Sequence, residues 1–133
     1  MEQTKKRVVL GIAGIALLIG LVCLGSYTKE VYDYQQDVKN IVITDVDLSK
    51  IADGAYIGEY NVSLIYAKVE VIVQNGKIEK ITLLEHKNER GKSAEKIIGD
   101  IIEQQSLDVD AVSGATNSSL VIKKAIENAL LEK

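Results

Sequence analysis

A short run of hydroxyl-bearing residues near the end of the chain has the composition of a ligand-binding loop. The stretch "DAVSGATNSS" spans residues 110–119 and precedes the last helical pattern. Gly114 allows a backbone conformation that other residues avoid. A helix N-terminus offers unpaired N–H groups and a partial positive charge, which would stabilise a phosphate held on Thr116. Two interpretations stay open on these residues alone: a turn leading to a helix cap, or a loop whose hydroxyl carries a phosphate-bearing group.

In the capping interpretation, Asn117 or Ser118 is the N-cap of the last helix. Thr116 then lies one or two residues before the helix begins. Either residue has a side-chain oxygen that can accept a hydrogen bond from the first turn.

The other reactive residues are few, and this excludes several kinds of site. The chain has one His, His86, and one Cys, Cys23, so we expect no His cluster, no Cys-based metal site and no disulfide. No nucleophile–base pair or paired carboxylates stand out, so we expect a cofactor to supply any chemistry, and no stand-alone enzyme. The net charge of −3, with both signs interspersed, argues against a nucleic-acid partner.

The N-terminus predicts a membrane anchor. Residues 8–24 carry no charge, and residues 25–27 extend this run toward the length that crosses a bilayer. Lys5, Lys6 and Arg7 precede it, so we expect the N-terminus in the cytoplasm and the remainder outside the cell membrane. A cleaved signal peptide and lipidation at Cys23 are alternatives. We favour a retained anchor in membrane lipid because the run is longer than a usual signal core.

Three regions follow from this pattern: a cytoplasmic stub and anchor at 1–27, a stalk at 28–50 and a compact domain at 51–133. Apolar residues recur at helical spacing in the first half of the stalk, which predicts that the anchor helix continues outward. The second half, "NIVITDVDLSK", alternates as an extended segment does.

The compact domain is predicted to be α+β, with a small antiparallel sheet packed against two C-terminal helices. "GAYIGEYNV" predicts a first strand. Val69, Val71 and Val73 alternate in a second strand, and Asn75-Gly76 predicts a type I′ turn into a third.

Two helices complete the domain. "SAEKIIGDIIEQQ" predicts the first, with Ser93 as its N-cap. Its apolar stripe comprises Ala94, Ile97, Ile98, Ile101 and Ile102, ending at Gln105. "SSLVIKKAIENALLEK" predicts the second, and its stripe comprises Ile122, Ala125, Ile126, Ala129 and Leu130.

From about Asp53 to Leu131 the chain resembles the FMN-binding domain family. The resemblance is carried by "DGAYIGEY", by "AKVEVIVQNGKIEKITLLEHK", by "GKSAEKIIGDIIEQQSLDVDAVSGATNSS" and by "KAIENAL". Its most specific part is the motif Asp-x-x-Ser-Gly-Ala-Thr. Every position of that motif is filled here, by Asp110, Ser113, Gly114, Ala115 and Thr116.

The resemblance implies a covalent flavin. In this family the motif is recognised by an exported flavin transferase, which takes FMN from FAD and joins it through its phosphate to the hydroxyl of the last residue, here Thr116. The chain would then be a membrane-anchored electron carrier, supplied by a membrane reductase or a quinone-linked donor. Non-covalent FMN, with Thr116 as a phosphate ligand, is one alternative. An anchored binding or scaffold module without redox function is another.

Further residues carry weaker expectations. His86, Lys87, Arg90 and Lys92 are placed on a loop that either tunes the flavin or is a solvated charged surface, with His86 structural or exposed. Tyr56, Tyr60 and Tyr66 either stack on the flavin or pack in the fold. Gln105, Ser106 and Asp108 either contact the ribityl chain or cap the first helix.

Overall fold

A computed structural model describes residues 1–88 and 91–132. The elements, in chain order, are α1 (Glu2–Lys39), the 3-10 turn η1 (Leu48–Lys50), β1 (Gly54–Val62), β2 (Ile65–Gln74), β3 (Lys77–Lys87), the 3-10 turn η2 (Lys92–Lys96), α2 (Ile97–Gln104) and α3 (Thr116–Leu131). The chain divides into two compact units, Met1–Gln35 and Gln36–Lys133. The predicted α+β class is confirmed.

The first unit is the greater part of α1. Its large apolar side chains between Val8 and Leu24 are exposed, as a helix surrounded by lipid requires. The Ser26 hydroxyl donates to the Val22 carbonyl at 3.0 Å, and the Thr28 hydroxyl donates to the Gly25 carbonyl at 2.9 Å. These polar groups are therefore satisfied within the helix. The helix is long and apolar enough to cross a membrane, which supports a membrane anchor.

The second unit is built on a three-stranded antiparallel sheet in the order β1-β2-β3. Asn75 and Gly76 connect β2 to β3 with φ angles of 52° and 71°, so the predicted type I′ turn is confirmed. The pairing of β2 with β3 shifts register at Lys68/Val69 and at Ile72/Val73. Because each strand pairs with the next one in the chain, the sheet consists of two β-hairpins.

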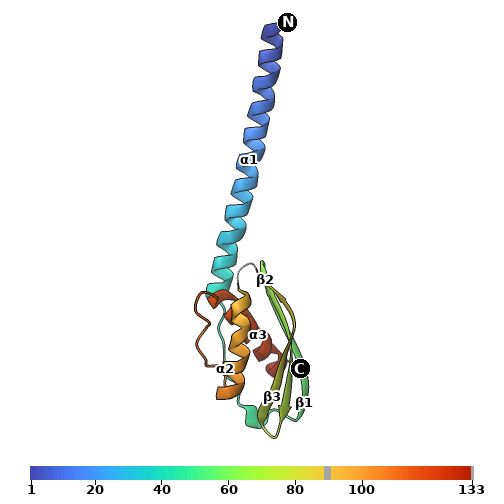
Figure 1. Ribbon diagram of the computed structural model, residues 1–133, viewed down its shortest axis with the longest axis vertical. Coiled ribbons are helices and arrows are strands. Elements are labelled where there is room, and N and C mark those ends of the chain that lie inside the picture. Colours follow the sequence, from blue (N-terminus) through green and yellow to red (C-terminus); the bar gives the residue numbers. More distant parts are fainter. Residues whose placement is uncertain (89–90, 133) are drawn as a thin grey trace. The chain divides into compact units, whose positions relative to one another are not determined.

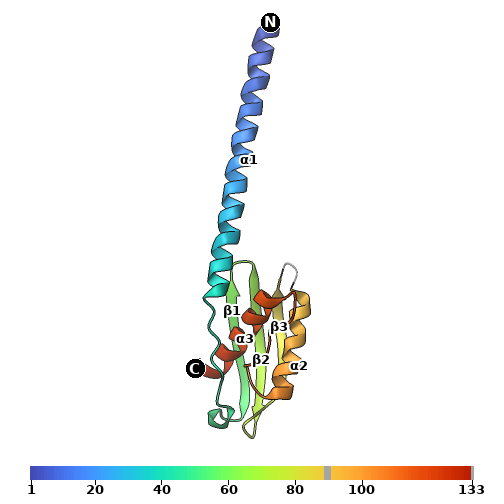
Figure 2. The same cartoon turned by 90° about the vertical axis from the view of Figure 1, so that its left-hand side faces the viewer.

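Helices α2 and α3 cover the same face of the sheet (Figures 1 and 2). The predicted valines of β2 face them, and Val69, Val71 and Val73 are at most 1% exposed. Every residue of the predicted α3 stripe is buried, from Ile122 to Leu130. On α2, Ile97 and Ile101 are buried whereas Ile98 and Ile102 are half-buried. The core therefore lies between one sheet face and these helices.

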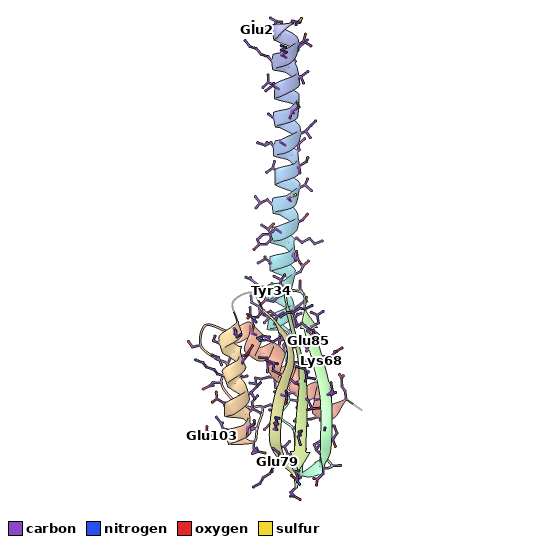
Figure 3. The ribbon with its side chains drawn as sticks, turned by 45° about the vertical axis from the view of Figure 1, so that its right-hand side comes forward. Glu2, Tyr34, Lys68, Glu79, Glu85 and Glu103 are labelled. Atoms are coloured by element: carbon purple, nitrogen blue, oxygen red, sulfur yellow. The ribbon has the colours of Figure 1, made fainter. Side chains whose placement is uncertain are left out.

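The opposite face of the sheet is not covered by these helices. Lys68 and Glu85 lie opposite each other on β2 and β3 there (Figure 3). Ile57 is 59% exposed and Leu84 is 46% exposed. Charged and apolar side chains thus alternate over this face.

Gly58 brings α3 into direct contact with β1. A β-carbon at this position would overlap the Ala125 carbonyl oxygen and the Ala129 backbone nitrogen. Beside this contact, the side chain of Asn128, the residue before Ala129, donates to the carbonyl of Glu59, the residue after Gly58, at 3.0 Å. Only glycine allows this approach, so Gly58 sets the height at which α3 lies over the sheet.

Residues 36–50, placed in the stalk by the sequence, belong to the second compact unit. Val38 is 4% exposed. The Thr44 amide donates to Oε2 of Glu127 at 2.8 Å, and Nζ of Lys124 donates to the Val42 carbonyl at 3.1 Å. This segment is therefore hydrogen-bonded to α3.

The predicted N-cap of the first C-terminal helix is wrong. Residues 92–96 form the 3-10 turn η2, whose N-cap is Gly91, a residue with no side chain to cap it. The α-helix begins only at Ile97. Ser93 lies inside the turn because the chain is already turning at Gly91, whose carbonyl accepts from the Ala94 amide at 2.9 Å.

Candidate functional site

Thr116 is the first residue of α3, and its side chain is exposed. The N-cap is Ala115, so the predicted caps Asn117 and Ser118 are wrong. The helix starts earlier because the Ala115 carbonyl already accepts from the Ser119 amide at 3.0 Å. Ser118 is 2% exposed, so its hydroxyl faces the protein. Thr116 thus lies on the helix end itself and not before it.

The N-terminus of α3 has no side-chain cap among the described residues. Ala115 has no side-chain oxygen with which to accept from the first turn. Gly114 has a φ of 78°, and apart from its two neighbours in sequence no atom of residues 1–88 and 91–132 lies within 4 Å of a β-carbon built on it. Ser113 and Gly114 are both exposed. The exposed Thr116 side chain therefore lies at the positive end of the helix dipole, two residues after a glycine with open space beside it.

The motif loop, residues 107–115, is attached to α3 by the buried Ser119. The Ser119 hydroxyl accepts from the Val112 amide at 3.0 Å and donates to the Ala115 carbonyl at 2.8 Å. Ser119 is fully buried. One side chain therefore satisfies two backbone groups of the loop and closes its second half against the helix.

Lys123 attaches the first half of the loop. Its ammonium donates to the Val109 carbonyl at 2.7 Å, and the residue is only 7% exposed. Burial lowers the pKa of Lys123, although the nearby carboxylates of Asp108, Asp110 and Asp45 oppose that shift. Asp110, the first residue of the motif, is therefore in the electrostatic field of a buried cation.

Ser119 and Lys123 belong to a polar stripe completed by Glu127 on the same helix. The three residues are four positions apart, so they lie on one face of α3. Glu127 is 6% exposed and accepts from the Thr44 amide and from Lys124. Sequence reasoning missed this stripe. Its signal was present, as polar residues at a spacing of four between the apolar positions of the helix.

Asp45 holds the start of the motif loop from the segment that follows α1. Its carboxylate accepts from the Leu107 amide at 3.0 Å and from the Ser106 hydroxyl at 2.8 Å. Burial favours the neutral acid, but these hydrogen bonds outweigh burial and lower the pKa of Asp45. Ser106 in turn accepts from the Asp108 amide at 2.9 Å. The Ser106 hydroxyl thus binds the backbone of the motif loop.

Gln105 joins α2 to the sheet. It is the C-cap of α2 in the left-handed conformation, with a φ of 54°. Its side chain accepts from the Ile78 amide at 2.7 Å and donates to the Ile78 carbonyl at 2.9 Å. It also donates to the Ile102 carbonyl at 2.8 Å. The Gln105 side chain therefore joins the C-terminal end of α2 to β3.

His86 lies in β3 and not on a loop, and its side chain is 3% exposed. Nδ1 lies 3.1 Å from Oε1 of Glu95, and the buried Nε2 has no hydrogen-bond partner within the described residues. Of the basic residues predicted to accompany it, Lys87 ends β3 and Lys92 is exposed in η2. Arg90 lies outside the described residues.

Gly91 attaches the segment after β3 to the first turn of α3. Its amide donates to the Asn88 side chain at 3.1 Å. A β-carbon on Gly91 would overlap the Ser118 hydroxyl and lie 2.6 Å from the Ser118 β-carbon. The end of β3 and the helix end that bears Thr116 are therefore neighbours.

The three tyrosines considered as flavin contacts lie on β1 and β2. The Tyr56 hydroxyl donates to the Ala52 carbonyl at 2.6 Å, and Tyr60 is half-buried. The Tyr66 hydroxyl donates to Glu59 at 2.7 Å, which raises the pKa of Tyr66 to about 12. Tyr66 also lines a hollow of about 330 Å³ with Asn61, Ser63, Leu64, Glu85 and Lys87. Tyr66 thus borders an open space large enough for part of a ligand.

The chain matches a known protein family. The family model of the FMN-binding domain matches residues 64–131, slightly more than half of the chain. That range begins beside β2 and includes the sheet pairing of β2 with β3, both C-terminal helices and the complete motif loop. No curated protein matches the chain.

Proposed function

The chain belongs to the FMN-binding domain family, and from that premise we propose that it carries FMN as a phosphoester on Thr116 and transfers electrons at the outer side of a membrane. The observation that supports this most directly is the place of Thr116. Its side chain is exposed on the first residue of α3, at the last position of a complete Asp-x-x-Ser-Gly-Ala-Thr motif.

The residues around Thr116 fit a phosphoester. A phosphate on this hydroxyl would lie beside the amides of the first turn of α3, which favour negative charge. Asn117 and Ser118 are the next residues of that turn, and Ser118 would contribute through its backbone amide because its side chain is buried. The absence of any atom within 4 Å of a β-carbon on Gly114 leaves room for the group to enter.

The attachment requires a second protein, an exported flavin transferase. The Thr116 oxygen would attack the FMN-side phosphorus of FAD, forming a P–O ester bond. The pyrophosphate bond breaks, AMP leaves, and the hydroxyl proton passes to a base of the transferase. Asp110, Ser113, Gly114 and Ala115 would be what the enzyme recognises around the reactive hydroxyl.

Bound FMN supplies the capacity to accept one or two electrons. The chain itself supplies attachment, orientation and location. Helix α1 would keep the carrier at the membrane with its N-terminus in the cytoplasm, within reach of a membrane reductase or a quinone-linked donor. A covalent bond suits this location because flavin lost outside the cell is not readily replaced.

The test is the intact mass of the protein purified from its native membrane. We expect a gain equal to FMN less water in the wild type and in Thr116→Ser, which keeps a hydroxyl, and no gain in Thr116→Ala. Unmodified wild type from cells that flavinylate other proteins would overturn the proposal. Flavin that is present but released on denaturation would favour non-covalent FMN instead.

A further inference from the structure

The motif loop is fixed by two side chains of the helix that begins at Thr116. Ser119 binds the Val112 amide and the Ala115 carbonyl, and Lys123 binds the Val109 carbonyl. Because both anchors and Thr116 lie on one rigid helix, the backbone on either side of Asp110 is held in a defined position relative to the reactive hydroxyl.

Stability of the fold does not account for Lys123. Burying an ammonium group has a large desolvation cost, and an apolar side chain of similar volume at such a site is often as stable or more stable. The three nearby carboxylates belong to exposed residues, so water can solvate them without the lysine. What only the lysine supplies is a hydrogen bond to Val109 and a positive charge beside Asp110.

We propose that Lys123, together with Ser119, is a positioning residue for flavin attachment: it holds Val109 and Asp110 in the conformation that the transferase recognises, so that the enzyme acts on the folded domain. This inference rests on the proposed function, because it requires that Thr116 be the attachment site. Lys123 takes no part in the transfer itself, since its ammonium is buried against the loop.

The chain provides a matched control in the next residue. Lys124 is on the same helix and is also bonded, but to Glu127 at 2.7 Å and to the Val42 carbonyl at 3.1 Å. It therefore anchors the segment after α1 and not the motif loop. Lys124→Met removes the same charge and the same number of atoms as Lys123→Met without releasing Val109.

The experiment measures covalent flavin on the full-length chain, incubated with purified transferase and FAD at varied chain concentration. We expect Lys123→Met to raise the KM for the chain about tenfold, the scale of one lost hydrogen bond from a charged donor, with a smaller change in kcat. Lys124→Met should keep the wild-type KM, and Lys123→Arg, which retains a donor, should recover part of the loss. Without transferase, the Val112 amide should exchange with deuterium faster in Lys123→Met than in Lys124→Met.

The outcomes separate the two proposals. A wild-type chain that the transferase does not modify at all overturns the proposed function. A modified wild type with an unchanged KM in Lys123→Met overturns the positioning role alone, as does an equal rise of KM in both methionine variants. Should Lys123→Met not fold, Ser119→Ala removes the anchor of Val112 and Ala115 instead, and a wild-type KM in that variant overturns the role.

Discussion

The two ends of α3 are held in different ways. Near its C-terminus the helix backbone touches β1 at Gly58, where no side chain intervenes. At its N-terminus, Thr116 is exposed and the preceding loop is attached through the Ser119 and Lys123 side chains. The first contact sets the position of the helix, and the second leaves Thr116, the proposed attachment site, accessible on a rigid support. The proposed site is thus an exposed side chain that contributes little to stability.

Breaking the C-terminal contact should have the largest effect. Gly58→Ala places a β-carbon onto the backbone of Ala125 and Ala129, which cannot move aside as a flexible side chain would. We expect a loss of about 3 kcal/mol in the free energy of unfolding. Denaturant unfolding of the detergent-solubilised chain measures it.

Gly99→Ala is the matched control for that substitution. Gly99 lies inside α2 with no atom within 4 Å of its added β-carbon. Alanine should stabilise the chain there by about 0.5–1 kcal/mol, because glycine is a poor helix former. Equal effects of the two alanines would contradict the packing account of Gly58.

At the N-terminal end, Gly91→Ala should cost about 2 kcal/mol, because its β-carbon would overlap the Ser118 side chain, whereas the Asn88 β-carbon lies at an ordinary contact distance of 3.7 Å. Ser118→Gly removes the obstructing atoms. A double-mutant cycle should therefore give a smaller loss for the pair than the sum of the single losses. Additive losses would show that Gly91 and Ser118 are not in contact.

A smaller effect is expected from the acid titration of Asp45, which supports the loop at this same end. Its pKa is lowered in the folded state, so the unfolded chain binds more protons in mildly acidic solution. The stability that Asp45 contributes is therefore present above the ordinary pKa of about 3.9 and is lost as pH falls through the folded value. Thermal midpoints of Asp45→Asn should fall less on acidification than those of the wild type. Parallel curves would contradict this contribution.

The smallest effect is expected at Thr116. Its side chain is exposed, so Thr116→Ala should change the free energy of unfolding by no more than about 0.5 kcal/mol. Denaturant unfolding of the wild type and of Thr116→Ala, both without attached flavin, measures this difference. A larger loss would mean that this helix end also carries stability, and the contrast between the two ends would no longer hold.

The parts of the fold that depend on local pattern were predictable. Asn75-Gly76 fixes its own turn because few residue pairs adopt two positive φ angles, and the apolar stripe of α3 identifies its buried face. The start of α3 was not predictable in this way. Asn117 and Ser118 are better caps than Ala115 by propensity, but Ser119 binds the loop and extends the helix to Thr116.

The candidate site shows the same division. The motif itself is a contiguous pattern, whereas its supports come from residues distant in the chain. Asp45 binds Leu107, 62 positions later, and Gly91 meets Ser118 only after the intervening η2 and α2 have folded. His86 was expected in a loop because charged residues surround it, but the sheet register places it inward, opposite Ala67. Such contacts depend on the tertiary fold.

The position of α3 after all three strands has a consequence for the order of folding. The strands pair with their neighbours in sequence, so the sheet can form early. Contact between α3 and β1 joins Glu59 to Asn128 across 69 positions and must await the synthesis of α3. We therefore expect the loop with Thr116 to acquire its structure only once α3 is complete. Attachment that needs this loop in place would then discriminate completed domains from truncated ones.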